Sequence, residues 1–213
     1  MKNIKLLVII CLTYACQEVN SNRKVIVSEK ADIYYNHKRE TGLKVNIEKS
    51  VIKWKGTKFN GLGSHSGVIK LSSGAIYFTN GKISAGKFEI DMLSIEVTDI
   101  PESDPIPRKN LRSHLMDKDF FYVEKYAKAI FEINQIQKIK ENQYSISGNL
   151  LMRGVSKNIT FDAEFDSLSR EKIIANARLS LNRQYWGVAY RGSKLKNDLV
   201  DDDILLDLYV ETD

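Results

Sequence analysis

Hydrophobic and polar residues alternate along most of the chain after residue 50, with the period of two that is typical of strands wet on one face. The clearest stretch is 158–165, where Ile159, Phe161 and Phe165 alternate with polar or charged residues. The alternation predicts eight strands, at 50–59, 68–79, 82–97, 129–139, 143–152, 157–167, 173–190 and 203–211. The chain is therefore expected to be an all-β protein.

Short turns connect most of these strands. Asn80-Gly81 lies between the second and third strands, and this dipeptide accepts the positive φ angles of a tight type I′ hairpin turn. Eight antiparallel strands can close into a barrel, and closure leaves no strand edge unpaired. The predicted fold is an eight-stranded antiparallel barrel.

Residues 99–128 have a different character. Three prolines fall between 101 and 107, and Leu111 and Leu115 follow at a spacing of four. That spacing suits a short helix with one apolar edge. We expect a short helical insertion between strands 3 and 4 that covers one end of the barrel.

The N-terminus has the features of an export signal. Two lysines precede an apolar run at 6–12, which is too short to span a bilayer, and Ala15 lies just before Cys16. Residues 1–15 are interpreted as a signal peptide, and Cys16 as the lipidated first residue of a lipoprotein in the periplasm or outer membrane. The alternative is ordinary cleavage after Ala15, which releases a secreted protein.

The polar segment at 16–42 is interpreted as a tether, and residues 43–213 as the barrel domain. The other cysteine, Cys11, would be removed with the signal peptide, so we expect no disulfide in the mature chain. The net charge of +5 is scattered, without a Lys/Arg block interleaved with aromatic residues. The sequence therefore favours no nucleic-acid partner.

Short sequence tags follow one another through the predicted domain in a fixed order. They are Trp54-Lys55-Gly56, His65-Ser66-Gly67, Ser73-Gly74, 86–92, Ser94-Ile95, Thr98-Asp99, His114-Leu115, Asp119-Phe120-Phe121, Tyr126, Phe131, Gly148-Asn149-Leu150, 154–157 and 182–188. In this combination the chain resembles the YceI-like family of bacterial lipid-binding proteins. Two positions depart from the family pattern: Ala127 stands where proline is usual, and Ser156 where threonine is usual.

The resemblance implies a lipocalin-like barrel and a non-catalytic carrier without a cofactor. The ligand would be an isoprenoid, an isoprenoid quinone or a fatty-acid-like amphiphile in an elongated apolar channel. The side chains expected to line the channel are Phe88, Ile90, Met92, Phe131, Ile133, Ile146, Phe161, Trp186 and Tyr190. His65, Arg112 and His114 are expected to meet the ligand's headgroup at the barrel mouth.

Two other interpretations remain open on sequence alone. The same aromatic side chains would also suit a filled core, in which case the protein is an envelope interaction or structural domain. A small hydrolase that uses His65 or His114 is a third interpretation, although no Gly-x-Ser-x-Gly motif is present. The histidines lack metal-site spacing, so no metal is expected, and the oligomeric state is open between monomer and homodimer.

Overall fold

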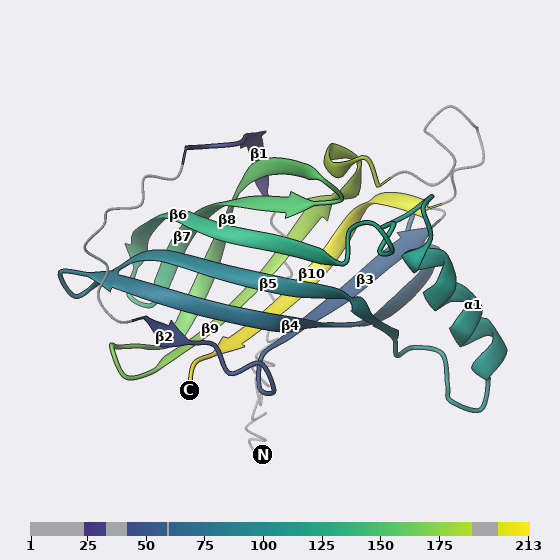
Figure 1. Ribbon diagram of the computed structural model, residues 1–213, viewed down its shortest axis with the longest axis horizontal. Coiled ribbons are helices and arrows are strands. Elements are labelled where there is room, and N and C mark those ends of the chain that lie inside the picture. The colour runs from purple at the N-terminus through teal and green to yellow at the C-terminus, as the bar shows by residue number, and fades with distance from the viewer. Residues whose placement is uncertain (1–23, 33–41, 59, 189–199) are drawn as a thin grey trace, which may run out of the picture.

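The computed structural model describes residues 24–32, 42–58, 60–188 and 200–213, and its main body is a closed antiparallel barrel (Figure 1). Eight long strands form the barrel wall: β3 (Val51–Lys58), β4 (Gly63–Thr79), β5 (Lys82–Val97), β6 (Lys128–Lys140), β7 (Gln143–Met152), β8 (Val155–Leu168), β9 (Ile173–Asn182) and β10 (Val200–Glu211). The predicted all-β, eight-stranded barrel is confirmed.

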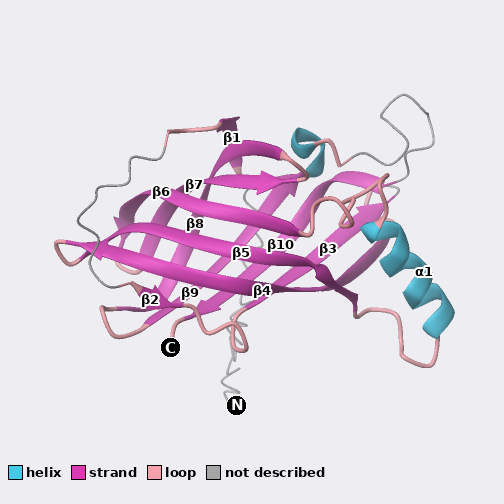
Figure 2. Cartoon of the chain, viewed as in Figure 1, coloured by secondary structure: helices cyan, strands magenta, loops and turns pink. Residues whose placement is uncertain are grey.

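The barrel closes through β10. Strands β3 to β9 pair with their sequence neighbours in order, and β10 pairs antiparallel with both β9 and β3. Leu206 is the partner of Trp54 on β3 and of Leu179 on β9. Figure 2 shows the resulting wall of strands, with a helix at one end. Side chains on alternate positions of every strand therefore face a shared interior.

Local sequence explains the strands and the sharpest turn. In β8, Ile159, Ala163 and Phe165 are buried, as the alternation predicts. Asn80 and Gly81 have φ angles of 52° and 76°, which are the positive values that a type I′ turn requires at both central positions. The β4–β5 hairpin therefore forms where the sequence predicts it.

The predicted helix is α1 (Pro105–Met116), which lies between the third and fourth strands of the wall. Leu115 is buried and Leu111 is half-buried, so the apolar edge faces the barrel. Arg108 Nε donates to the Val97 carbonyl at 2.8 Å, and Arg112 Nε donates to the Ile95 carbonyl at 2.7 Å. These charge-assisted bonds fix α1 to the end of β5.

The strand predicted at 173–190 is too long, because β9 ends at Asn182 and a 3₁₀ turn, η1 (Arg183–Trp186), follows. The Asn182 side chain accepts a hydrogen bond from the Gln184 backbone N–H, which starts the turn. Gly187 ends it with a φ of 65°. The strand predicted at 68–79 is too short, because β4 begins at Gly63, five positions before the predicted start.

Part of the segment interpreted as a tether forms a strand, β1 (Ile26–Glu29), which pairs antiparallel with β8. A second short strand, β2 (Leu43–Lys44), pairs with β4. In the apolar run from Val25 to Val27, the two valine side chains pack against the hydrophobic core and stabilise the pairing of β1 with the wall. The signal peptide, Cys16 and residues 33–41 lie outside the described residues.

Of the helices in the described part of the chain, none has the length and apolar character needed to cross a bilayer.

Arg183 is a fully buried cation at the α1 end of the barrel. Its guanidinium donates to the carbonyls of Val188 at 2.5 Å, Val200 at 2.8 Å and Asp201 at 3.2 Å. The ring of Phe120 lies 5.6 Å from the guanidinium carbon. Arg183 therefore joins the chain after β9 to the beginning of β10.

Glu211 fixes the other end of β10. Its carboxylate accepts hydrogen bonds from Lys172 Nζ at 2.6 Å, Lys49 Nζ at 2.9 Å and the Tyr209 hydroxyl at 2.8 Å. The hydrogen bond from Lys172 lowers the pKa of Glu211 most, and those from Lys49 and Tyr209 add to it, so that the pKa falls to about 2. The carboxylate thus links the β8–β9 turn, the turn before β3 and β10.

Replacement of Glu211 by Gln is expected to lower the melting temperature at neutral pH. Because the folded-state pKa is depressed, the stabilisation is present above the unfolded-state pKa near 4.5 and is lost as the pH falls through about 2. Thermal melts across this pH range should show a difference between parent and E211Q that shrinks with acidification. E171Q, in the exposed β8–β9 turn, is the matched control, and a pH-independent difference for E211Q would contradict the assignment.

Replacement of Arg183 by Met should lower the free energy of unfolding by about 2–4 kcal/mol, because three carbonyls lose a charged donor at a buried position. R178M is the matched control, since Arg178 is exposed and its ion pair with Asp207 should contribute less than about 1 kcal/mol. Urea unfolding of the two variants measures the contrast. Equal losses would show that the buried guanidinium has no special part in closing the barrel.

Candidate functional site

The barrel interior contains a cavity of about 300 Å³. All eight wall strands and α1 contribute side chains to its lining, and nearly all of these side chains are apolar. This volume lies at the lower end of the roughly 300–1,000 Å³ that is usual for sites of small organic ligands. The interior is therefore partly filled core and partly a space that one apolar chain segment could occupy.

Aromatic rings form one part of the cavity wall. The ring centroids of Phe88 on β5 and Phe131 on β6 are 6.3 Å apart, and that of Phe161 on β8 is 5.7 Å from Phe131. Most of the remaining lining side chains are large aliphatic ones, and four alanines lie among them: Ala129, Ala163, Ala175 and Ala177. Larger residues at these four positions would take up space in the cavity.

Most of the side chains that sequence analysis selected do line the cavity. They are Phe88, Ile90, Met92, Phe131, Ile133, Ile146 and Phe161, together with His65 and His114 at the mouth. The alternation of each strand selected the apolar residues of this set, whereas His65 and His114 were selected as polar groups at the mouth. Their contact with a ligand stays a prediction.

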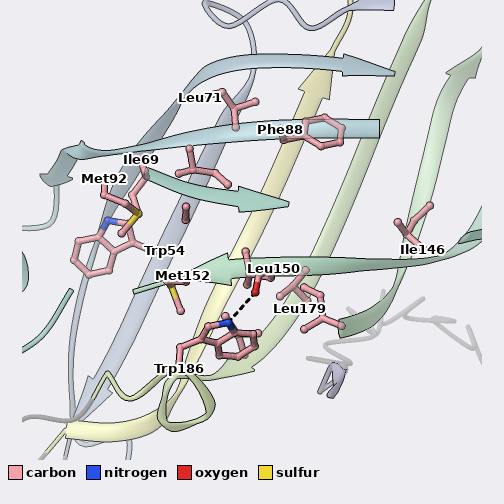
Figure 3. Close-up of a cluster of buried hydrophobic side chains, with 14 of the residues drawn as sticks. Trp54, Ile69, Leu71, Phe88, Met92, Ile146, Leu150, Met152, Leu179 and Trp186 are labelled. Atoms are coloured by element: carbon pink, nitrogen blue, oxygen red, sulfur yellow. Dashed lines mark hydrogen bonds between the residues drawn. The ribbon is translucent and has the colours of Figure 1, made fainter. Parts of the chain in front are cut away.

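Two of the selected residues lie elsewhere. Trp186 is fully buried in η1, where its indole N–H donates to the Leu150 carbonyl at 3.0 Å (Figure 3), and it does not line the cavity. Arg112 uses its guanidinium to hold α1 to the Ile95 and Leu93 carbonyls and does not line the cavity, so its headgroup role stays a prediction. Tyr190 lies outside the described residues.

Trp54 lines the cavity and was not selected from the sequence. Its ring lies over Gly67 on β4, where an added Cβ would come within 2.7 Å of Trp54 Cζ2 and 1.7 Å of the Glu96 carbonyl. Its indole N–H is buried and has no acceptor among the described residues.

The lining residues that were not selected include Ile204, Leu206 and Leu208 on β10. Their alternation with Leu205 and Asp207 was visible in the sequence, and it would have identified them had inward positions of every strand been counted. Ala163, Ala175 and Ala177 also lie on alternating positions, so the same count would have included them.

Polar groups gather where the cavity meets the α1 end, which we call the mouth: Thr57, Lys58, Ser64, His65, His114, Arg183 and Asp201. His65 Nδ1 lies 2.9 Å from Asp99 Oδ2, and the Ser66 backbone N–H donates to Asp99 Oδ1 at 3.0 Å. Burial alone would raise the pKa of Asp99, but these bonds from Ser66 and His65 outweigh it and leave that pKa below its usual value. The Asp99 carboxylate therefore positions the His65 ring at the rim.

Asp201 is the second carboxylate at the mouth. It accepts hydrogen bonds from the Thr57 hydroxyl at 2.5 Å and from the backbone N–H groups of Asn60 and Gly61 at 3.1 and 3.0 Å. The Thr57 bond contributes most to lowering the pKa of Asp201. The carboxylates of Asp99 and Asp201 thus both bind backbone N–H groups and order the chain around them. The mouth therefore presents an ordered polar rim to an incoming molecule.

The geometry offers little to a hydrolase or a metal. Within the described chain, no serine or threonine hydroxyl is in hydrogen-bond reach of the His65 ring, whose partner is Asp99. No group of three or more His, Cys, Asp or Glu side chains among the described residues is arranged to hold an ion. What the site can do is bury an apolar chain and leave a polar group at the rim.

Comparison with known proteins agrees with this architecture. Residues 43–212 match the model of the YceI-like domain. A UPF0312 protein of Pseudomonas fluorescens is 31% identical over 99 residues, which cover 44% of this chain and 50% of that protein. The chain thus spans about half the length of this relative.

Two solved structures share the fold. BcnA of Burkholderia cenocepacia has a TM-score of 0.62 at 18% identity, covering 78% of this chain and 98% of BcnA. A polyisoprenoid binding domain from Saccharophagus degradans has a TM-score of 0.57 at 13% identity, covering 82% of this chain and 99% of that domain. With the family match over residues 43–212, these findings establish that the chain belongs to the YceI-like domain family.

Proposed function

We propose that this protein is a non-catalytic carrier that holds the apolar chain of an isoprenoid, an isoprenoid quinone or a similar long-chain amphiphile inside its barrel. The observation that carries the proposal is the apolar cavity within the closed wall, with polar groups confined mainly to one end. The Saccharophagus degradans neighbour, described as a polyisoprenoid binding domain, supports the same ligand class.

Burial of methylenes would drive binding. Each methylene moved from water into the barrel contributes roughly 0.8 kcal/mol, and no directional contact along the tail is needed. The aromatic side of the wall, formed by Phe88, Phe131 and Phe161, offers flat apolar surface to the tail. At the rim, His65 and His114 would meet the headgroup, so the ligand would have a defined orientation.

A filled-core interaction domain is the weaker alternative. Protein interiors are normally packed without voids of this size, so a filled core would place larger side chains at the inward alanine positions. Native mass spectrometry of the purified protein, followed by organic extraction, tests the two functions directly. A stoichiometric lipid in the extract supports the carrier.

We further propose that the carrier works in the cell envelope, tethered to a membrane by a lipid on Cys16. The support is the sequence before the barrel: an apolar run, a small residue at Ala15 and a polar stretch after Cys16. A tethered carrier would remain close to the membrane from which its ligand comes.

The substitution A163F tests the cavity. Ala163 is buried and lines the cavity, so the added ring should fill the space and abolish lipid co-purification with little change in melting temperature. In a packed core the same ring would cost about 1–3 kcal/mol. A127F, half-buried and outside the cavity lining, is the matched control. A clear fall in melting temperature for A163F, in a parent that carries no extractable lipid, would contradict the carrier function.

The substitution C16S tests the anchor. Without the thiol no lipid can be attached, so C16S should move from the membrane fraction to the non-membrane fraction after cell lysis. C11S, which alters the other cysteine within the expected signal peptide, should fractionate as the parent does. If C16S stays with the membranes as fully as the parent, the anchor is wrong, although the barrel's function is untouched.

A further inference from the structure

The barrel wall is not continuous between β8 and β9. These strands pair with each other from Glu164 to Leu168 on β8 and from Ile173 to Asn176 on β9. The first half of β8 pairs on this side with β1 instead, in the register Ile26 to Thr160 and Glu29 to Lys157. We call the gap between β8 and β9 that β1 occupies the seam.

β1 touches both sides of the seam. Lys24 forms a parallel bridge with Ser180 on β9, and the Val25 backbone N–H donates to the Ser180 carbonyl at 3.1 Å. Val25 and Val27 pack against the hydrophobic core, whereas Ile26 between them is 70% exposed. Residues 24–29 thus complete the wall at the seam, and β1 lies beside β8 (Figure 1).

The strands that flank the seam carry cavity-lining side chains. Ile159 and Phe161 lie on β8 beside β1, and Leu179 and Leu181 lie on the part of β9 that β8 leaves unpaired. Apolar side chains of β8 and β9 therefore both line the cavity and flank β1. The mouth, in contrast, is rimmed by Lys58, His65, Asp201 and other polar groups.

β1 is held by its short ladder with β8, by the packing of Val27 against the core and by ion pairs at the surface. Its ion pairs, Lys24 with Asp203 and Glu29 with Lys157, are 2.7 Å long but each includes a largely exposed partner, and such pairs contribute little. The α1 end is fixed more firmly, by the bonds of Arg108, Arg112 and the buried Arg183 to main-chain carbonyls. A short terminal strand with these contacts is the part of the wall that opens at least cost.

One buried side chain latches the end of β1. Asn149 accepts from the Ala31 backbone N–H at 3.0 Å and donates to the Ala31 carbonyl at 2.7 Å, and it is 3% exposed. Departure of β1 would expose this amide to water, which would replace the two lost bonds. The latch therefore orders β1 without making its release prohibitive.

We propose that the seam is a lateral port of the barrel, and that release of β1 controls the exchange of the apolar chain between the cavity and its surroundings. The inference rests on the proposed carrier function. An apolar chain that leaves through the seam meets apolar side chains on both sides, whereas one that leaves through the mouth must pass ion-paired groups. Release of β1 would also open the wall beside the cavity, and a ligand larger than 300 Å³ would need this additional space.

A disulfide lock tests the port. Ile26 and Thr160 are paired residues of β1 and β8, so I26C with T160C would bond β1 to the wall in the oxidised protein. Q137C with S145C, on the paired strands β6 and β7, is the matched lock away from the seam. Cys11 and Cys16 are replaced by Ser in every variant. Uptake and release of a fluorescent anthraniloyl ester of farnesol are followed with each lock oxidised and reduced.

We expect the oxidised seam lock to slow uptake and release by about tenfold or more, with equilibrium affinity unchanged, and reduction to restore both rates. The control lock should exchange equally in its two states. Equal exchange in both states of the seam lock would overturn the port and point to the mouth. Failure of the parent to bind the probe at equilibrium would instead overturn the carrier function, and the port with it.

A second pair of variants tests the port without a disulfide. V27S removes an inward side chain of β1, whereas I26S changes its exposed neighbour. V27S should loosen β1 and raise the release rate several-fold, while I26S should leave it unchanged. If V27S and I26S release the probe at the parent's rate, although V27S exposes β1 to proteolysis, the port is excluded.

Discussion

The barrel depends on one strand being held at both ends. β10 follows the other described strands along the chain. It is the only one of them that joins β3 to β9, so without it the wall is an open sheet. Charged side chains secure it: Arg183 binds the carbonyls at its start, and Glu211 near its end collects Lys49, Lys172 and Tyr209. The inward side chains of all eight strands surround one cavity because this closure joins β3 to β9.

The closure also explains why polar chemistry is concentrated at the ends of the barrel. Along the wall the backbone groups satisfy one another, so inward side chains need not be polar. Where strands end, backbone groups lose those partners, and Arg183, Asp201 and Asn182 supply hydrogen bonds instead. The same arrangement that completes the fold therefore produces an apolar interior with a polar rim.

Strand positions could be predicted from the sequence because a period of two is a local property. Ile159, Phe161 and Phe165 predict β8, and Asn80-Gly81 predicts the turn of the β4–β5 hairpin, without reference to the rest of the chain. Trp186 was misplaced because it follows an alternating strand, although Asn182 ends that strand and caps the 3₁₀ turn that contains Trp186. β1 was missed since three apolar residues in a polar segment form a strand only when a gap in the wall receives them. The volume of the cavity depends on how side chains from all eight strands pack against one another, which no local pattern reveals.

The two tryptophans of the chain stand in different surroundings. Trp186 is sealed from solvent with its N–H bonded to Leu150, whereas Trp54 forms part of the cavity wall and lacks an acceptor. Indole emission responds to the polarity and hydrogen bonding around the ring. The fluorescence of Trp54 therefore reports the environment of the cavity, whereas that of Trp186 reports the packed region around η1.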